Sequence, residues 1–296
     1  MTKVRTVKTL FSSPKAVVGM IHVGALPGTP RNSEPLAAII ARAREEAETY
    51  TQAGVDALII ENMHDVLYLK GSVGPEITAA MTAVGLAARE ECSQVRGEIH
   101  VPAPKPGHKS VPTPLPLGVQ ILAAANREAL AVALAIGAAF VRVENFAYAH
   151  VADEGLMSIA EAGPLLRYRR QIGAEHIKIL ADVKKKHSSH ALTADVSLAE
   201  AAGTTEFFGA EAVVVTGTAS GQPALPEDVG TVKNAVGIPV CIGSGLTPEN
   251  LPDLWAYADV FIISSYFKRD GLWSNPIDGQ RAAGFMAAAA RLRKES

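Results

Sequence analysis

The sequence predicts an α/β protein with the (β/α)8 architecture of a TIM barrel. Eight short apolar segments alternate with segments of helical period, the pattern of a parallel sheet that is buried on both faces. Most of the apolar segments end in polar residues, and the carboxyl ends of the strands carry the active site in such barrels. A Gly-rich turn follows the seventh segment, whereas an open doubly wound sheet, the main rival fold, would place it after the first.

The first predicted strand, residues 16–23, is a continuous apolar run that leads into a loop of Gly and Pro residues. A weak internal repeat supports the later strands, because Gly54, Gly137 and Gly209 each precede an apolar run that ends in polar residues. A glycine at such a position is typical of a helix end. The remaining predicted strands are residues 55–61, 117–122, 139–144, 176–183, 212–216, 238–242 and 259–263.

Helices are predicted between these strands because apolar residues gather on one side of each segment and charged residues on the other. Residues 35–53 show this arrangement, and Gly54 ends the segment. The other predicted helices are residues 75–91, 127–136, 159–171, 197–206, 226–236, a helix that Thr247 and Pro248 cap and open, and residues 282–293.

Residues 93–116 interrupt the alternation before the third strand. They are too rich in proline for a helix or a central strand, because proline removes a backbone donor and fixes φ. We therefore predict a single barrel domain over residues 1–296 with a proline-rich excursion at about 93–116.

Composition and charge narrow the class of protein and its partners. The net charge is −2 and the one basic run is residues 184–186, which argues against nucleic acid or an acidic membrane surface. The N-terminus lacks the apolar core of a signal peptide, and no apolar run is long enough for an integral membrane segment. Cys92 and Cys241 form no CxxC pattern, so we expect neither a disulfide framework nor a zinc ribbon. We expect a soluble, cytoplasmic protein.

Polar side chains at the strand ends supply the candidate catalytic residues: His22, Glu61, Glu144, Asp182 and Lys184. Residues i and i+2 of a strand share a face, so Arg142 and Glu144 point into the barrel if the valines between them face the helices. The repeat carries Glu61 to the same face, and Asp182 would share a face with Lys184. A ring of carboxylates balanced by Arg142 and Lys184 suits an active site, and a structural ion-pair network in the upper barrel is the alternative.

These side chains suit acid–base chemistry or the binding of a cation. A carboxylate could take up a proton or hold a divalent metal ion, and His22 could act as acid or base near neutral pH. A histidine before a Gly-rich loop is also commonly a hydrogen-bonded structural residue. The candidate substrate-binding residues are Asn62, Asn145, Arg142, Thr216, Gly243, Ser244, Gly245, Ser264 and Ser265, with Gln120 as a further polar strand end.

The turn of Gly243, Ser244 and Gly245 lies where phosphate sites occur in these barrels, and Ser264 and Ser265 end the neighbouring strand. The alternative is a tight turn that needs glycine for its backbone angles. His64-Asp65 and His187 with His190 could ligate a metal, but their spacing matches no strong signature. We assign no metal ligand and leave the cofactor open, a divalent metal included. The lysine run could bind a substrate anion or form a solvated loop.

Several segments together resemble the BtpA family: VVGMIHVGALPGTP (17–30), GVDALIIENMHDVLYLKGSVGPE (54–76), AFVRVENF (139–146), ILADVKKKH (179–187), VVTGTASGQP (214–223), IGSGLTPENL (242–251), YADVFIISSYFK (257–268) and G.W.NPID (271–278). The resemblance implies a barrel of the ribulose-phosphate-binding group. The family is named after a cyanobacterial factor for photosystem I biogenesis, whereas other relatives occur in non-photosynthetic organisms, some beside sugar-metabolism genes. The resemblance departs at 93–116, and it transfers no catalytic residue.

The favoured function is that of an enzyme acting on a phosphorylated sugar or nucleotide-like small molecule. Isomerisation or epimerisation, lyase chemistry and metal-assisted hydrolysis all suit the predicted ring. A non-enzymatic biogenesis or assembly factor for membrane complexes of the photosystem I type is the first alternative, and a sensor of a phosphorylated metabolite is the second. A homodimer or higher oligomer is the default expectation.

Overall fold

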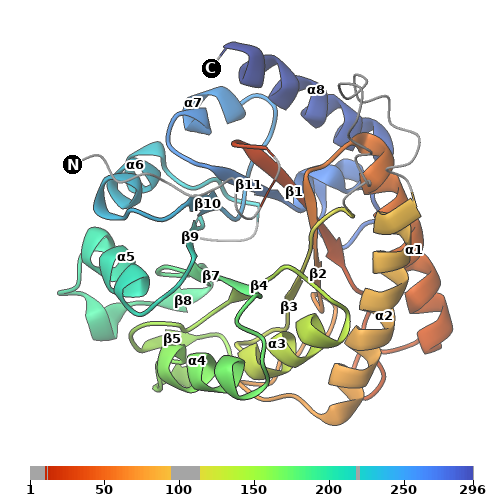
Figure 1. Ribbon diagram of the computed structural model, residues 1–296, viewed down its shortest axis with the longest axis horizontal. Coiled ribbons are helices and arrows are strands. Elements are labelled where there is room, and N and C mark those ends of the chain that lie inside the picture. Colours follow the sequence, from red (N-terminus) through yellow and green to blue (C-terminus); the bar gives the residue numbers. More distant parts are fainter. Residues whose placement is uncertain (1–10, 12, 95–113, 218–220, 296) are drawn as a thin grey trace, which may run out of the picture.

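Eight parallel strands close into a barrel in the computed structural model (Figure 1). The structure describes residue 11 and residues 13–94, 114–217 and 221–295. The strands follow the order β1-β11-β10-β9-β7-β4-β3-β2 around the barrel, which confirms the predicted fold class and excludes the doubly wound sheet. Their bounds are β1 Ala16–His22, β2 Ala57–Glu61, β3 Leu117–Gln120, β4 Phe140–Val143, β7 Lys178–Asp182, β9 Ala212–Val215, β10 Val240–Ile242 and β11 Val260–Ile263.

Helices surround the barrel in Figure 1, one after each barrel strand. Gly54 ends the first of them with a left-handed backbone, φ 82°, and its N–H donates to the Thr51 carbonyl. Their bounds are α1 Leu36–Ala53, α2 Pro75–Gln94, α3 Asn126–Ala135, α4 Ala162–Gln171, α5 Leu198–Phe207, α6 Pro226–Ala235, α7 Leu251–Trp255 and α8 Gly279–Glu295. In the described part of the chain, no helix combines the length and apolar character that crossing a membrane would require.

The barrel interior is an apolar floor with a polar layer above it. The floor is built from inward residues of the strands together with Phe11, whose ring meets the Phe140 ring edge-on at 5.6 Å between centroids. Side chains alternate along a strand, so the other strand residues face the helices. Two residues beyond the floor positions Met20, Ile59, Phe140 and Leu180, the inward residues are His22, Glu61, Arg142 and Asp182.

A small antiparallel sheet, absent from the prediction, lies beside the barrel strands. It has the order β6-β5-β8 and is made of β5 His150–Ala152, β6 Gly155–Met157 and β8 Ser188–Ser189. β5 and β6 form a hairpin after β4, and β8 follows β7. Strands of two or three residues leave no periodic signal in a sequence. Short 3-10 helices occupy other loops: η3 Ala191–Thr193, η4 Ser265–Phe267 and η5 Arg269–Gly271.

The predicted proline-rich excursion at 93–116 falls mostly outside the described residues, which break off after 94 and resume at 114. On the near side of the gap, α2 continues to Gln94. On the far side, the Leu115 N–H donates to the Cys92 carbonyl at 3.3 Å. The two described ends of the gap therefore lie next to each other, beside the end of α2.

Candidate functional site

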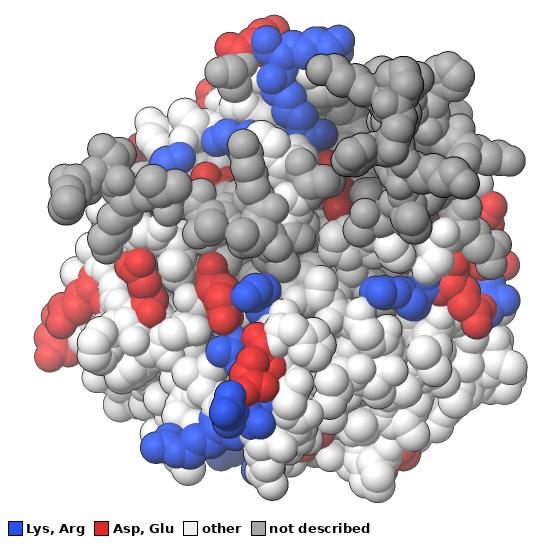
Figure 2. Space-filling view, viewed as in Figure 1, with Lys and Arg blue, Asp and Glu red and all other residues white. Residues whose placement is uncertain are grey.

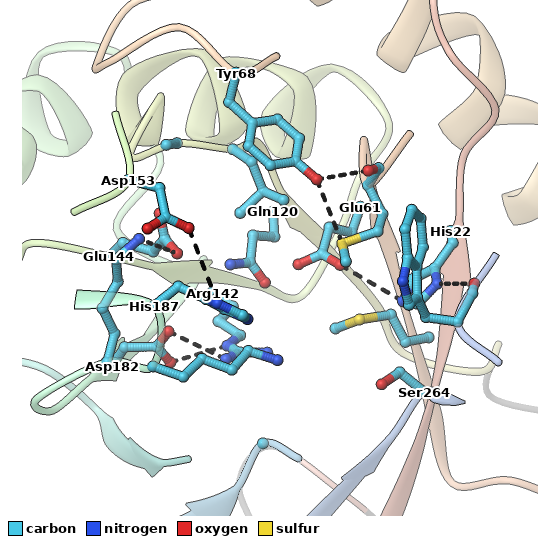
Figure 3. Close-up of a pocket in the computed structure, with 18 of the residues that line it drawn as sticks. His22, Glu61, Tyr68, Gln120, Arg142, Glu144, Asp153, Asp182, His187 and Ser264 are labelled. Atoms are coloured by element: carbon cyan, nitrogen blue, oxygen red, sulfur yellow. Dashed lines mark hydrogen bonds and ion pairs between the residues drawn. The ribbon is translucent and has the colours of Figure 1, made fainter. Parts of the chain in front are cut away.

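A cavity of about 280 Å³ opens at the carboxyl ends of the strands, directly above the apolar floor. Its wall combines side chains of β1, β2, β3, β4 and β7 with residues that follow β10 and β11. Figure 3 shows Arg142 between Glu61 and Asp182, with His22 beyond Glu61. The sequence-predicted residues that line this cavity are His22, Glu61, Gln120, Arg142, Glu144, Asp182, Gly243, Ser264 and Ser265.

Arg142 and Asp182 form a buried bidentate ion pair at the centre of the site. Arg142 Nε donates to Asp182 Oδ1 at 2.9 Å, and Nη2 donates to Oδ2 at 3.1 Å. Burial opposes the charge of Arg142, but Asp182, through its charge and hydrogen bonds, raises the pKa of the guanidinium together with the charges of Glu61 and Glu144. A Cβ atom on Gly243 would lie 3.1 Å from Arg142 Nη2 and 2.8 Å from Val214 Cγ1. Gly243 is therefore glycine because the guanidinium and its neighbours leave no room for a side chain.

His22 and Glu61 are register partners on neighbouring strands. His22 Nδ1 donates to the Trp273 carbonyl at 2.8 Å, so Nε2 of the neutral ring carries the lone pair, and it lies 3.7 Å from Glu61 Oε2. Burial, followed by the charge of Lys268, holds the pKa of His22 well below its usual value. Burial raises the pKa of Glu61, although the Arg142 charge opposes it. A neutral imidazole next to a carboxyl that holds its proton more strongly than an exposed glutamate is suited to paired base and acid roles.

Glu144 is held from both sides. Its Oε1 accepts from Lys185 Nζ at 3.1 Å, and its Oε2 accepts from the Ala124 N–H at 3.0 Å. Burial opposes the charge of Lys185, but Glu144 raises the pKa of the ammonium above its ordinary value. Glu144 is thus a fixed, paired carboxylate on the cavity wall.

Lys184 does not line this cavity, and the expectation that it shares the inward face of Asp182 is wrong. β7 ends at Asp182, and Lys184 takes a left-handed backbone with φ 45°. Its ammonium donates instead to the Val196 carbonyl at 2.5 Å. The two lysines that follow it, Lys185 and Lys186, line the cavity.

A smaller cavity of about 150 Å³ adjoins the first, and Ser264 and Ser265 line both. Gly245, with φ 68°, and Arg281 also line it. Arg281 Nε donates to the Tyr266 carbonyl at 2.7 Å, and the guanidinium lies 4.3 Å from the centre of the Tyr266 ring. This cavity brings hydroxyl groups and a fixed cation to the place where the sequence predicts an anion site.

The two helices that begin next to this cavity are short. Thr247 and Asn250 exchange hydrogen bonds, with Thr247 N 2.9 Å from Asn250 Oδ1 and Asn250 N 3.4 Å from Thr247 Oγ1, as in a capping box. However, α7 has only 5 residues and η4 only 3. Helix dipoles therefore contribute less to an anion site here than the sequence suggested.

Two further candidates, Ser244 and Thr216, hold loops in place and do not line the large cavity. Ser244 Oγ donates to the Gln222 carbonyl at 3.0 Å and accepts from the Gly217 N–H at 2.9 Å. Thr216 Oγ1 accepts from the Lys186 N–H at 3.0 Å. Their structural role is to position the chain around the site.

Asn62 and Asn145 likewise serve the backbone. Asn62 Oδ1 accepts from the Leu122 N–H at 2.7 Å, and its amide donates to Asp65 Oδ2 at 2.9 Å. Asn145 donates to the Ile159 carbonyl at 2.7 Å. Neither asparagine lines the large cavity.

The histidines considered as metal ligands have other neighbours. The His64 ring packs on Trp273 with 5.1 Å between centroids, and His190 Nε2 lies 3.0 Å from the Lys185 carbonyl oxygen. His187 is 3.9 Å from an Asp153 carboxylate oxygen. Across the ranges that the structure describes, no group of three or more His, Cys, Asp or Glu side chains is arranged to hold a metal ion.

Loop residues that the sequence did not predict complete the wall. Tyr68 follows β2 and donates to the Met63 carbonyl at 2.6 Å, and Asp153 sits in the turn of the β5–β6 hairpin. Trp273 follows η5 and lines the cavity. Trp273 and Tyr68 carried a usable signal, since both lie within segments that resemble the family, residues 271–278 and 54–76.

Charges of both signs are mixed on the molecular surface. Figure 2 shows Lys and Arg side chains interspersed with Asp and Glu on the face in view. Exposed ion pairs include Arg44 with Glu90 at 2.7 Å and Arg170 with Glu175 at 2.5 Å. On the described residues in this view, no continuous basic area stands out.

The fold and its cavity define the class, a (β/α)8 barrel protein with a polar cavity at the carboxyl ends of its strands. A model described as the BtpA family matches residues 13–101 and 109–291. The chain belongs to the BtpA family.

Relatives agree with this assignment, and solved structures share the barrel fold. An uncharacterized mitochondrial protein of Caenorhabditis elegans is 45% identical over 287 residues, covering 97% of each chain. The photosystem I biogenesis protein BtpA of Synechocystis is 32% identical over 281 residues, covering 95% of this chain and 90% of the relative. Thiamine phosphate pyrophosphorylase of Pyrococcus furiosus matches with a TM-score of 0.54 at 13% identity, covering 94% and 96% of the two chains. Phosphoribosyl anthranilate isomerase of Thermus thermophilus matches with a TM-score of 0.51 at 14% identity, covering 94% of this chain and 99% of the isomerase. At these identities the structures show a shared fold.

Proposed function

We propose that this protein is an enzyme that acts on a phosphorylated sugar or a nucleotide-like phosphorylated small molecule by acid–base chemistry. One observation carries the proposal. The cavity that holds His22 and Glu61 shares Ser264 and Ser265 with the smaller cavity that Arg281 lines. A substrate with a reactive carbon at one end and an anionic group at the other fits this layout.

In the proposed reaction, His22 and Glu61 exchange protons with the substrate. His22 Nε2, left as the lone-pair nitrogen by the Nδ1 bond to Trp273, takes a proton from carbon. Glu61 keeps its proton more strongly than an exposed glutamate, so it donates to the oxygen that gains electron density. Arg142 stabilises the negative charge that develops there. Isomerisation or epimerisation is the reaction class that such a pair serves best.

The remaining groups position this pair. Asp182 orients Arg142 through the two hydrogen bonds between them, and Lys185 fixes Glu144. At the other end, the Ser264 and Ser265 hydroxyls would bind the phosphate oxygens. The names of the two structural neighbours contain phosphorylated compounds, thiamine phosphate and phosphoribosyl anthranilate. At 13% and 14% identity, however, these structures are evidence for the fold alone. The substrate class therefore rests on the two cavities that share Ser264 and Ser265.

The test is a thermal-shift screen of the pure protein against sugar phosphates and nucleotides, with Ser265→Asp and Ser265→Asn as a matched pair. The two variants differ in charge at nearly equal size. A ligand present at a hundred times its Kd stabilises the native state by about 2.7 kcal/mol. We expect a phosphate compound to stabilise the wild type and Ser265→Asn, but not Ser265→Asp. If no phosphorylated compound raises Tm, the proposal fails.

A second function, assembly of a membrane complex, is favoured by two observations. The Synechocystis relative is named a photosystem I biogenesis protein. In addition, Leu67, Leu69 and Leu156 are 72%, 60% and 47% exposed, and Lys70 Nζ donates to the Leu156 carbonyl at 3.2 Å, which brings the two loops together. Co-sedimentation with membranes, lost in Leu67→Ser with Leu69→Ser, would support this function.

Turnover separates the remaining alternative, a sensor of a phosphorylated metabolite, from the enzyme. A sensor would bind the stabilising compound without converting it, whereas the enzyme would lose turnover in Glu61→Gln while retaining binding. We further propose a cytoplasmic location and a homodimer or higher oligomer, to be tested by cell fractionation and by light scattering. The name of the Caenorhabditis elegans relative instead places that protein in mitochondria.

A further inference from the structure

Three consecutive lysines after β7 have three different environments. The Lys184 ammonium donates to the Val196 carbonyl, and the Lys185 ammonium pairs with Glu144 at 3.1 Å. Lys186 lines the large cavity. Within the described residues, neither an ion pair nor a hydrogen bond holds its ammonium group, whereas its backbone N–H is bound. Of the three, Lys186 is the amine that is both at the cavity and available to a ligand.

The backbone around Lys186 is fixed at both of its polar groups. The N–H donates to Thr216 Oγ1, just beyond the end of β9, at 3.0 Å, and the carbonyl accepts from Ser188 Oγ at 3.4 Å. These bonds tie the residue to the neighbouring barrel strand and to the small sheet. The side chain is therefore carried on an anchored segment, as a reacting group requires.

The electrostatic surroundings of Lys186 favour its neutral form. Burial lowers the pKa of its ammonium, the Arg142 charge lowers it further, and the Glu61 carboxylate opposes this shift. Desolvation and a neighbouring cation are the two conditions that make a lysine amine nucleophilic near neutral pH. By contrast, Glu144 raises the pKa of Lys185, so the adjacent lysine remains charged.

We propose that Lys186 is a nucleophile that condenses with a carbonyl carbon of the substrate to form an imine, which makes the substrate class a phosphorylated aldose or ketose. The inference deepens the proposed function, on which it rests, because it concerns the same cavity. It also gives a role to a part of the lysine run that the sequence left open between an anion site and a solvated loop.

The proposed step balances without an oxidant, a reductant or a further reactant. The amine lone pair forms the C–N bond while the carbonyl π electrons move to oxygen, and a proton passes from nitrogen to that oxygen to give the carbinolamine. Glu61 then protonates the hydroxyl, which leaves as water with the electrons of the C–O bond. The nitrogen lone pair forms the C=N bond, and the iminium carries the positive charge. His22 Nε2 can next take the proton from the adjacent carbon.

Trapping tests this inference directly. The full-length protein is incubated with dihydroxyacetone phosphate or with dihydroxyacetone, each with sodium cyanoborohydride, and the modified peptides are located by mass spectrometry. We expect a reduced adduct on Lys186 and not on Lys184, with more adduct from the phosphate. The adduct should be lost in Lys186→Arg and in Lys186→Met and retained in Lys184→Arg, with melting curves showing that each variant is folded.

Formaldehyde with cyanoborohydride is a second probe that does not depend on the substrate. It should label Lys186 faster than Lys184 and Lys185 at pH 7. No adduct from dihydroxyacetone phosphate, together with formaldehyde labelling of Lys186 no faster than that of Lys184, overturns the inference. If the same phosphate nevertheless stabilises the wild type and not Ser265→Asp, the proposed function survives without the imine. Equal trapping of both ketones upholds the role of Lys186 and counts against the phosphate site.

Discussion

The buried ion pair between Lys268 and Glu46 provides a sharp test of how this barrel is held together. Lys268, at the end of η4, has no exposed surface, and its Nζ lies 2.6 Å from Glu46 Oε2 on α1. The pair therefore connects the segment after the last barrel strand to the first helix. Replacing Lys268 by Met removes the cation and leaves the Glu46 carboxylate buried without it.

The expected loss is large because the remaining charge stays desolvated. Removing one partner of a buried pair typically costs about 3–5 kcal/mol, whereas replacing both by apolar side chains is often neutral or stabilising. The pKa of Lys268 points the same way, since burial lowers it in spite of the Glu46 charge. We therefore expect Lys268→Met to lower the free energy of unfolding by about 3–5 kcal/mol and Glu46→Leu to restore most of that loss in the double variant.

Urea unfolding followed by circular dichroism measures these differences. Arg170→Met is the control, because Arg170 pairs with Glu175 at 2.5 Å but its side chain is 84% exposed. An exposed pair contributes little to stability, because water screens its charges. The reasoning is refuted if Lys268→Met costs no more than Arg170→Met, or if the double variant is as unstable as Lys268→Met alone.

Two further predictions concern packing and pH. Gly243→Ala should cost about 1–3 kcal/mol of unfolding free energy, because the added Cβ would lie 2.8 Å from Val214 Cγ1. Gly203→Ala in α5 is the control and should be neutral or stabilising, because an added Cβ would meet no atom within 4 Å. Equal melting temperatures of the two variants would contradict this prediction. Burial, followed by the Lys185 charge, lowers the pKa of His150 to about 4. The unfolded chain therefore takes up a proton before the native state does, and stability should fall by up to about 3 kcal/mol as pH drops from 6.5 to 4. His150→Gln should flatten this fall in urea-unfolding curves, and an unchanged slope would contradict the assignment.

Strand parity explains why much of the site could be predicted. The side-chain period of a strand is two, so the sequence placed Arg142 and Glu144 inside the barrel, and both line the cavity. The same rule failed at Lys184, because β7 ends at Asp182 and the backbone turns left-handed two residues later. Beyond the end of a strand, the direction of a side chain depends on the hydrogen bonds of the loop, which follow no regular repeat in the sequence.

The loops also explain which parts of the fold were missed. The β5–β6 hairpin has strands of 3 residues each, too short for periodicity to reveal, yet its turn places Asp153 on the cavity wall. The sequence predicted that Thr247 and Pro248 cap and open a helix. Thr247 and Asn250 do exchange hydrogen bonds, but α7 begins only at Leu251, and its N-cap residue, Asn250, makes no side-chain capping bond. The sequence gave no length for that helix, because the following residues lack a clear apolar period.

Because Trp273 lines the cavity, its intrinsic fluorescence can report on ligand binding. The chain has two tryptophans. Trp255 stacks on the Phe261 ring at 4.9 Å in the buried core, far in sequence from the site residues of β1 and β2. Trp273 lines the cavity, and its carbonyl holds His22. A Trp255→Phe protein would carry a single indole, so its fluorescence would follow a ligand that displaces water from the cavity, and substrates could be sought by titration without any label.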